Sequence, residues 1–245
     1  MSVIALLSDF GLTDPYVGVM KGVIANIAPN VTIIDLTHGV PPQAVMIAAL
    51  HLDAAWRYFP LGSVFVVVVD PGVGTARRPL IATLGGKHFV GPDNGVLSLL
   101  PGATYRCIEA DWGLPERSPT FHGRDLFAPV GARVARGAAV DMVGPIVRDP
   151  VRITIPEPER GFGQVLYIDH YGNAITNHPG TAGGYLHVLG HVVEVRQTYG
   201  EVGRGELVAV TGSTGRLEIA VRDGSAAGML GLEPGSPVIY DDGQG

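Results

Sequence analysis

Asp70 and Arg77 place a carboxylate and a guanidinium just after a run of valines. They are the first and last residues of the segment Asp-Pro-Gly-Val-Gly-Thr-Ala-Arg. The run itself, residues 66–69, contains only valine and predicts a fully buried strand. The proline removes a backbone donor and the two glycines permit turn conformations, so the strand should end at Asp70. Because charged groups at the carboxyl end of a buried strand lie where open α/β sheets bind ligands, chemistry is the first hypothesis for this turn.

Polar side chains also follow other predicted strands. Apolar runs lead into polar or glycine-rich turns within residues 6–11, 33–39 and 89–95, and a further polar cluster at residues 120–125 precedes a helical stretch. Such strand ends meet at one edge of a sheet. Asp9, in the first of these turns, is suited to accept both hydroxyl hydrogens of a ribose diol. Asp14, five residues later, either belongs to the same polar cluster or acts as the N-cap of a helix beginning near Pro15.

His122 lies within the cluster Thr-Phe-His-Gly-Arg-Asp, and its type suits either a structural hydrogen bond or catalysis. A metal site is not implied, because the eight histidines include no His-x-x-His or His-Glu-x-x-His spacing and the chain has a single cysteine. Farther along, Asn173 offers a donor and an acceptor that suit an adenine edge, and Tyr171 could stack on the ring. A hairpin turn explains the same asparagine equally well.

Composition limits the classes of protein that this chain can belong to. Its 245 residues are 46% hydrophobic and only 16% charged, which indicates a globular fold with extensive burial. The net charge of −6 disfavours nucleic-acid binding and mildly suits a cationic small ligand. With no long apolar stretch and no basic segment at the N-terminus, we expect neither a membrane span nor a signal peptide, and a cytoplasmic location.

The change in hydrophobic pattern along the sequence predicts two domains. Residues 1–155 alternate apolar strands with helix-period segments, typical of an α/β domain with a mostly parallel sheet flanked by helices. A proline-rich, charged linker follows, and residues 162–245 carry short valine-rich runs separated by glycines, typical of a small all-β barrel-like domain. The predicted helices are residues 15–27, 42–58, 95–100 and 125–136, and the predicted barrel strands are residues 164–168, 185–189, 191–195, 207–210, 217–221 and 237–240.

Taken together, the motifs at residues 8–17, 70–75, 91–95, 120–125 and 168–173 resemble those of the S-adenosylmethionine hydroxide adenosyltransferases, relatives of the fluorinase and chlorinase enzymes. The resemblance covers nearly the whole chain in order. It implies hydrolysis of S-adenosylmethionine to adenosine and methionine, with this molecule as substrate and no cofactor. It also implies a homotrimer whose active sites lie between one subunit's N-terminal domain and its neighbour's C-terminal domain.

The resemblance also implies roles for individual residues. The family's catalytic aspartate, arginine and histidine fall on Asp70, Arg77 and His122, and these groups suit the activation and orientation of a water molecule. Which of them is the base stays open. The remaining implied contacts belong to the substrate: Asp9 for the ribose, Asp14, Tyr16 and Asp169 for the methionine part, and Tyr171, Asn173 and the turn containing Ser213 for the adenine.

Two other functions use the same pocket. A halogenase would attack the substrate with a halide, but a carboxylate at Asp70 would repel that anion at close range. A non-catalytic sensor of adenosine or S-adenosylmethionine would need Asp9 and Asn173 without any use for Asp70, Arg77 and His122. The complete set of three therefore favours an enzyme whose nucleophile is water or hydroxide.

Overall fold

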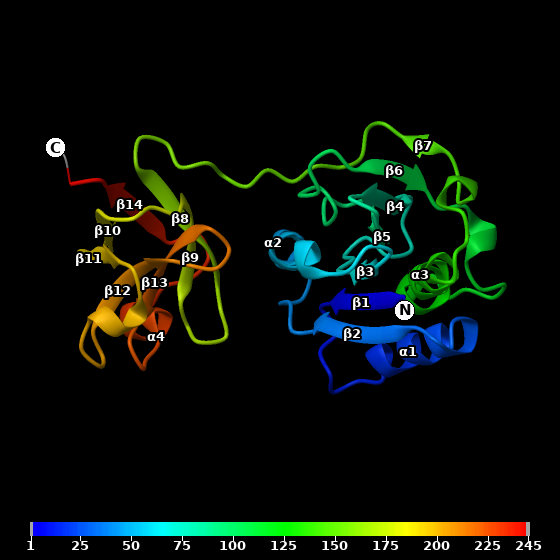
Figure 1. Cartoon of the computed structure of the whole chain (residues 1–245), viewed down its shortest axis with the longest axis horizontal. Coiled ribbons are helices and arrows are strands. Elements are labelled where there is room, and N and C mark those ends of the chain that lie inside the picture. Colours follow the sequence, from blue (N-terminus) through cyan, green and yellow to red (C-terminus); the bar gives the residue numbers. More distant parts are fainter. Residues whose placement is uncertain (1, 244–245) are drawn as a thin grey trace. The chain divides into compact units, whose positions relative to one another are not determined.

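The computed structural model describes residues 2–243 (Figure 1). The chain divides into two compact units, the first ending at Ile153 and the second beginning at Thr154. The predicted domain limits, residues 155 and 162, lie just after this division. Within the described residues, no helix is long and apolar enough to cross a membrane.

The first unit is built on a seven-stranded sheet with the strand order β2-β1-β3-β5-β4-β6-β7. The four strands from β2 to β5 in that order run parallel, and the β5-β4, β4-β6 and β6-β7 pairs are antiparallel. The strands are β1 (Val3–Ser8), β2 (Thr32–Thr37), β3 (Val64–Val68), β4 (Pro79–Leu84), β5 (Lys87–Pro92), β6 (Thr104–Cys107) and β7 (Ile146–Val147).

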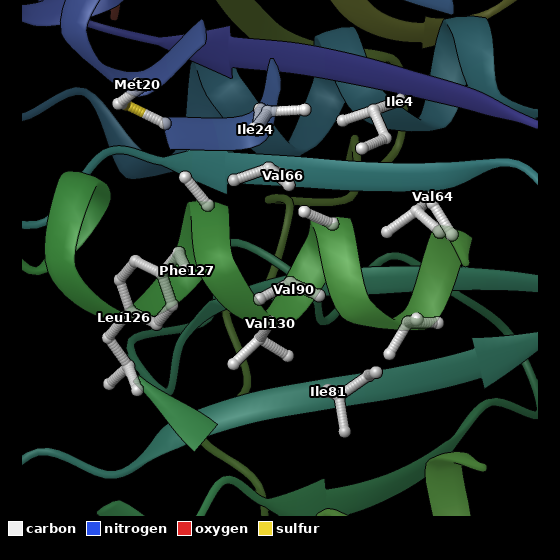
Figure 2. Close-up of a cluster of buried hydrophobic side chains, with 14 of the residues drawn as sticks. Ile4, Met20, Ile24, Val64, Val66, Ile81, Val90, Leu126, Phe127 and Val130 are labelled. Carbon is white, nitrogen blue, oxygen red and sulfur yellow. The ribbon is translucent and has the colours of Figure 1, made fainter. Parts of the chain in front are cut away.

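Helices cover both faces of this sheet because its central strands are apolar on both sides. Alternate residues of β1 and β3 enter two separate core clusters: Ile4 and Val66 belong to one, Ala5 and Phe65 to the other. Helices α1 (Tyr16–Ile27) and α3 (Ala128–Ala135) contribute to the first cluster, which Figure 2 shows, and α2 (Val45–Ala55) contributes to the second. This confirms the predicted class of the unit.

The order of the strands explains where a ligand can bind. From β1 the chain passes outward to β2 and then returns to β3 on the other side of β1, so connections leave β1 in opposite directions (Figure 1). The carboxyl ends of two such strands form a topological switch point, the usual ligand crevice of α/β sheets. Ser8 pairs with Val68 in the ladder, and the residues that follow place Asp9 and Asp70 at this one edge.

The turn after β3 needs a glycine at one of its two glycine positions. Gly74 has a φ of +77°, and a Cβ there would lie 2.6 Å from the Pro119 carbonyl oxygen. Gly72 meets neither condition, so the prediction that both glycines supply special conformations is wrong for Gly72. Asn94 supports the same strand end by donating from Nδ2 to the Val69 carbonyl at 2.8 Å.

Two predicted helices differ from the structure: one begins later than expected, and the other does not form. The second, predicted from Pro42, begins at Val45 because residues 41–44 form a turn in which Gln43 has a φ of +67°. A 3₁₀ turn (η1, Trp56–Tyr58) then completes it. The helix predicted at residues 95–100 is wrong: these residues form consecutive turns, Gly95 has a φ of +97°, and six residues are too few for an independent helix.

The helix predicted at residues 125–136 starts earlier, as a π-helical turn (η3, Gly123–Phe127) that continues into α3. Pro129 has no N–H to donate to the carbonyl of Asp125, four residues earlier. That carbonyl accepts instead from the Leu114 backbone at 2.7 Å. The helix therefore opens into a wider turn directly after His122, as often happens beside functional sites.

The second unit is a closed seven-stranded barrel, which confirms its predicted class. Its strand order is β10-β11-β12-β13-β9-β8-β14, and β9 was not predicted because its residues Thr176, Asn177 and His178 are polar. The elements are β8 (Phe162–Ile168), β9 (Ala174–Pro179), β10 (Tyr185–Val188), β11 (His191–Arg196), β12 (Leu207–Thr211), β13 (Arg216–Val221), the short helix α4 (Ala226–Leu230) and β14 (Pro237–Asp241).

Candidate active site

The structure brings Asp70, Arg77 and His122 into direct contact. Arg77 Nε donates to both carboxylate oxygens of Asp70 at 3.0 Å, and Nη2 makes a further short bond to Oδ2. The same Nη2 donates to His122 Nδ1 at 2.8 Å. Only 5% of the Asp70 side chain and 9% of the Arg77 side chain are exposed, so both charges are held in a nearly dry environment. The guanidinium also lies over the Phe127 ring, 5.2 Å from its centroid.

This arrangement determines the state of His122. Arginine has no acceptor, so His122 Nδ1 must accept the bond and the ring proton must be on Nε2. Burial first, and then the adjacent positive charge of Arg77, lowers the pKa of His122 below its ordinary value. At neutral pH the imidazole is therefore uncharged and offers an N–H donor from Nε2.

Asp9 lies at the neighbouring strand end and is held by a backbone donor. Its Oδ2 accepts from the Gln43 N–H at 2.8 Å, whereas Oδ1 has no hydrogen-bond partner among the described residues. Gln43 can donate in this direction because its φ of +67° places it in the left-handed region, where non-glycine residues are uncommon. The carboxylate thus keeps one open oxygen at the switch point.

A pocket of about 410 Å³ joins these groups. Its lining includes Asp9, Asp70, His122 and Tyr16. Arg77 is not part of the lining but forms hydrogen bonds to Asp70 and His122. Rings of Phe10, Tyr16 and Phe121 pack against one another beside it, with centroids 5.3 to 5.9 Å apart.

Asp14 does not line this pocket. The predicted alternative for it is wrong, since Pro15 is the N-cap residue of α1 and no side chain caps the helix. Asp14 is exposed and has no side-chain hydrogen bond within residues 2–243.

The predicted residues of the second unit line another pocket, of about 900 Å³. Asp169 and Asn173 close the loop between β8 and β9: Asp169 Oδ1 accepts from the backbone of Tyr171 and Asn173, and Asn173 Nδ2 donates to Oδ2 at 3.0 Å. Asn173 thus stabilises the hairpin loop through its N–H groups, and its amide oxygen stays available in the pocket that it lines. Tyr171, 75% exposed, contacts the His170 ring, and Ser213 belongs to the turn between β12 and β13.

Several residues of the two pockets were missed by the sequence analysis. Gln43 follows two prolines, a pattern that predicts a turn, but no signal identifies a left-handed glutamine that binds Asp9. Phe10 and Phe121 could have been found from their places beside Asp9 and His122. In the second unit, Glu218 was read as part of a plain strand. No group of three or more metal-ligating side chains that could hold an ion occurs among the residues described.

Comparison with known proteins identifies the family. The model of the SAM hydroxide adenosyltransferase N-terminal domain matches residues 4–144, and that of the C-terminal domain matches residues 163–239. A protein of Thermus thermophilus named (R)-S-adenosyl-L-methionine hydrolase is 44% identical over 257 positions, which cover 97% of this chain and 99% of that protein. A fluorinase of an Actinoplanes species is 31% identical over 211 positions, 71% of each chain.

A solved structure agrees over the same length. The crystal structure of an uncharacterized conserved protein from Thermotoga maritima has a TM-score of 0.90 and 36% identity, and the match covers 97% of this chain and 100% of that one. Both domain models match in the expected order, and the similarity to the hydrolase extends over almost the entire sequence. The chain therefore belongs to the SAM hydroxide adenosyltransferase family.

Proposed function

We infer that this protein hydrolyses (R)-S-adenosyl-L-methionine to adenosine and methionine. The observation that carries this inference is the contact of Asp70, Arg77 and His122 at the edge of a pocket that also holds Asp9. The 44% identity with a protein named for this activity supports it. That name specifies the (R) configuration at the sulfonium sulfur, which the sequence motifs alone do not distinguish.

The chemistry asks little of the protein beyond positioning. The sulfonium leaves as a neutral thioether, so no acid has to protonate it. A water oxygen forms a bond to the ribose 5′ carbon as the carbon–sulfur bond breaks, the electron pair stays on sulfur, and one proton of the water is released.

The hydrogen bonds support a different role for each of the three residues. Because His122 Nδ1 accepts from Arg77, the histidine acts as a donor that orients the water, and Asp70 is the group that accepts its proton. Arg77 fixes both partners and balances the charge of Asp70. The released proton then passes from Asp70 to solvent.

Binding of the substrate uses the other predicted residues. The open Oδ1 of Asp9 accepts from the ribose diol, and Tyr16 and Asp14 contact the methionine part. In the second unit, Asn173 and Tyr171 bind the adenine through the free amide oxygen and the exposed ring, together with the turn that contains Ser213. Asp169, which lines the same pocket, contacts the methionine part. Apart from Asp14, the residues predicted to contact the substrate thus line two pockets, one in each unit.

This distribution supports the assembly that the family resemblance implies. We propose a homotrimer in which the first unit of one subunit and the second unit of its neighbour together hold one substrate molecule. Oligomers of this kind repeat the same interface around a closed ring. A monomer would then be inactive although both of its units are folded.

The test is incubation of the protein with separated (R) and (S) epimers of S-adenosylmethionine, followed by chromatography for adenosine and methionine. Equal amounts of both products, formed faster from the (R) epimer, are expected. In water enriched in oxygen-18, the label should enter the 5′ hydroxyl of adenosine. A 5′-halogenated nucleoside formed when chloride or fluoride is added would indicate a halogenase, and tight binding without any product would indicate a sensor.

A further inference from the structure

One buried carboxyl group of the second unit has no role in the function described so far. Glu218 lies in the middle of β13, where Leu217 and Ile219 point into the barrel core. Glu218 faces the other side of the strand and lines the pocket that holds Asp169 and Asn173. Only 7% of the residue is exposed. A carboxyl group at such a position is rare unless a partner compensates for its lost hydration.

Only one of the two oxygen atoms of this carboxyl group has a hydrogen-bond partner among the described residues. Glu218 Oε1 accepts a short hydrogen bond from the Tyr199 hydroxyl, while Oε2 has no hydrogen-bond partner among residues 2–243. No arginine or lysine in that range forms an ion pair with Glu218 either. Arg222 lines the same pocket, but its Nη1 donates to the carbonyls of Gly200 and Val202.

The neighbouring turn leaves room for the open oxygen. A Cβ at Gly212 would lie 2.1 Å from Glu218 Oε2, closer than any side chain can approach. The φ of Gly212 lies outside the left-handed region, so a side chain at this position is limited by the space that Glu218 occupies and not by the backbone conformation. The carboxyl group therefore rests against the turn that carries Ser213, with Oε2 toward the pocket.

The surroundings favour a positively charged ligand. Burial, and to a smaller extent the negative charge of Asp169, raises the pKa of Glu218 even though the Tyr199 hydrogen bond acts in the opposite direction. A cation beside Oε2 would remove this penalty, because an opposite charge favours the ionised form. An ammonium group beside Oε2 would both fill the open acceptor and compensate for a buried carboxylate that has no ion-pair partner among residues 2–243, whereas a neutral donor would do only the first.

We propose that Glu218, oriented by Tyr199 and given space by Gly212, accepts a hydrogen bond from the α-ammonium group of the methionine part of the substrate. This inference rests on the proposed function. The sulfonium carries charge but no hydrogen to donate, and the adenine amino group donates but carries no charge. Among the three groups, the α-ammonium alone satisfies both requirements of Oε2. Glu218 is then a specificity-determining residue that distinguishes an aminoacyl-bearing nucleoside from a simple one.

The test compares two ligands that differ in the amino acid. S-adenosylhomocysteine has the α-ammonium but no sulfonium, and 5′-methylthioadenosine lacks the amino acid altogether. Glu218→Gln keeps the size of the side chain and an oxygen for Tyr199 but removes the charge. By calorimetry, the variant should bind S-adenosylhomocysteine about tenfold or more weakly, as expected for a lost charged hydrogen bond, and 5′-methylthioadenosine within about twofold of wild type.

Two further variants make the result specific. Glu194→Gln removes the same charge from an exposed ion pair with Arg196 on β11, outside this pocket, and should leave both affinities unchanged. Gly212→Ala retains the charge but displaces Oε2, and it should weaken S-adenosylhomocysteine selectively. It therefore provides the same readout if Glu218→Gln does not fold, which thermal unfolding would reveal.

The outcomes separate this inference from the proposed function. Equal weakening of both ligands, or no weakening of either, would overturn the role of Glu218 while wild-type hydrolysis of S-adenosylmethionine remained intact. If the wild-type protein neither hydrolysed S-adenosylmethionine nor bound S-adenosylhomocysteine, the proposed function itself would fail. In an active wild type, the KM for S-adenosylmethionine should also rise about tenfold or more in Glu218→Gln, with a smaller change in kcat.

Discussion

Arg77 Nη2 donates to His122 Nδ1 at 2.8 Å while the same guanidinium holds the carboxylate of Asp70. One planar, permanently charged group thereby fixes the positions of two others and the tautomer of the histidine. A carboxylate beside an arginine alone would make a simple ion pair. The addition of an oriented imidazole, at the edge of a pocket, gives the arrangement that can hold and deprotonate a water molecule.

Replacing Arg77 by lysine should separate charge from geometry. Lysine keeps the positive charge but lacks the planar fork that reaches Asp70 and His122 together. We expect kcat to fall about 100-fold or more, a loss typical of disrupted acid–base catalysis, with little change in adenosine affinity. Asp70→Ala and His122→Ala should likewise lower turnover far more than affinity. Arg57→Lys, in an exposed ion pair with Asp53, is the matched control. Wild-type turnover in any of the three variants would refute the role assigned to that residue.

Activity should decline on the acid side because of His122. Its pKa in the folded protein is lowered from 6.5, by burial first and then by Arg77. At pH above 6.5 the imidazole is neutral in both the folded and the unfolded chain, and its contribution to stability is fully present. As the pH falls through the lowered pKa, the proton gained at Nδ1 breaks the bond from Arg77, and that contribution is lost. The kcat/KM profile should therefore stay flat as the pH drops past 6.5 and fall only as it passes through the lowered pKa. In His122→Gln, kcat/KM should be lower at every pH and this acid limb should be absent.

Asp9→Ala should act on binding and not on the chemical step. The open Oδ1 of Asp9 is the acceptor assigned to the ribose diol, and a hydrogen bond to a charged group contributes roughly 1.5–3 kcal/mol. Adenosine affinity, measured by calorimetry, should therefore fall by at least about tenfold. The same substitution at Asp53, a half-buried residue of α2 that does not line the pocket, should have no effect. Unchanged adenosine binding in Asp9→Ala would exclude Asp9 from the ribose site.

The fold is predictable from the sequence where apolar runs are unbroken. Val64–Val68 and its neighbours identify a buried parallel sheet by composition alone. By contrast, β9 is invisible to such patterns because Thr176, Asn177 and His178 are buried with polar partners that are distant in sequence, such as the Leu217 and Val238 carbonyls.

The candidate sites follow the same division. Topology places Asp9 and Asp70 at one edge, which the strand-end reading anticipates. The hydrogen bond from Gln43 to Asp9 depends on a single backbone torsion, and the open oxygen of Glu218 depends on the space left by one glycine. Neither feature produces a periodic pattern in the sequence. The roles of the individual site residues stay predictions, and the variants described above test them.

Gln43 offers a test of how Asp9 is held. Its φ of +67° costs free energy for a residue with a side chain, on the order of 1 kcal/mol, and glycine adopts this conformation freely. Gln43→Gly should keep the N–H donor, leave adenosine affinity within about twofold, and raise or leave unchanged the melting temperature. Gln43→Pro removes the donor and cannot adopt a positive φ, so it should lower both stability and affinity. Equal adenosine affinity in the two variants, measured by calorimetry below their melting temperatures, would show that the Gln43 N–H does not position Asp9.

Subunit mixing tests the proposed assembly. Asp70→Ala disables the pocket of the first unit, and Asn173→Ala disables the adenine contact of the second, so each homogeneous oligomer should be inactive or nearly so. If sites form between subunits, exchange between the two variants creates some interfaces at which both residues are intact. At such an interface the first unit comes from an Asn173→Ala chain and the second unit from an Asp70→Ala chain, so both mutations lie at other interfaces. Activity should return to a fraction of wild type, in proportion to the exchange measured with differently tagged chains. A mixture of Asp70→Ala with His122→Ala is the matched control: both changes lie in the same unit, so no intact site can arise and no activity should return. A fully active monomer by light scattering, or no recovery despite demonstrated exchange, would contradict a site shared between subunits.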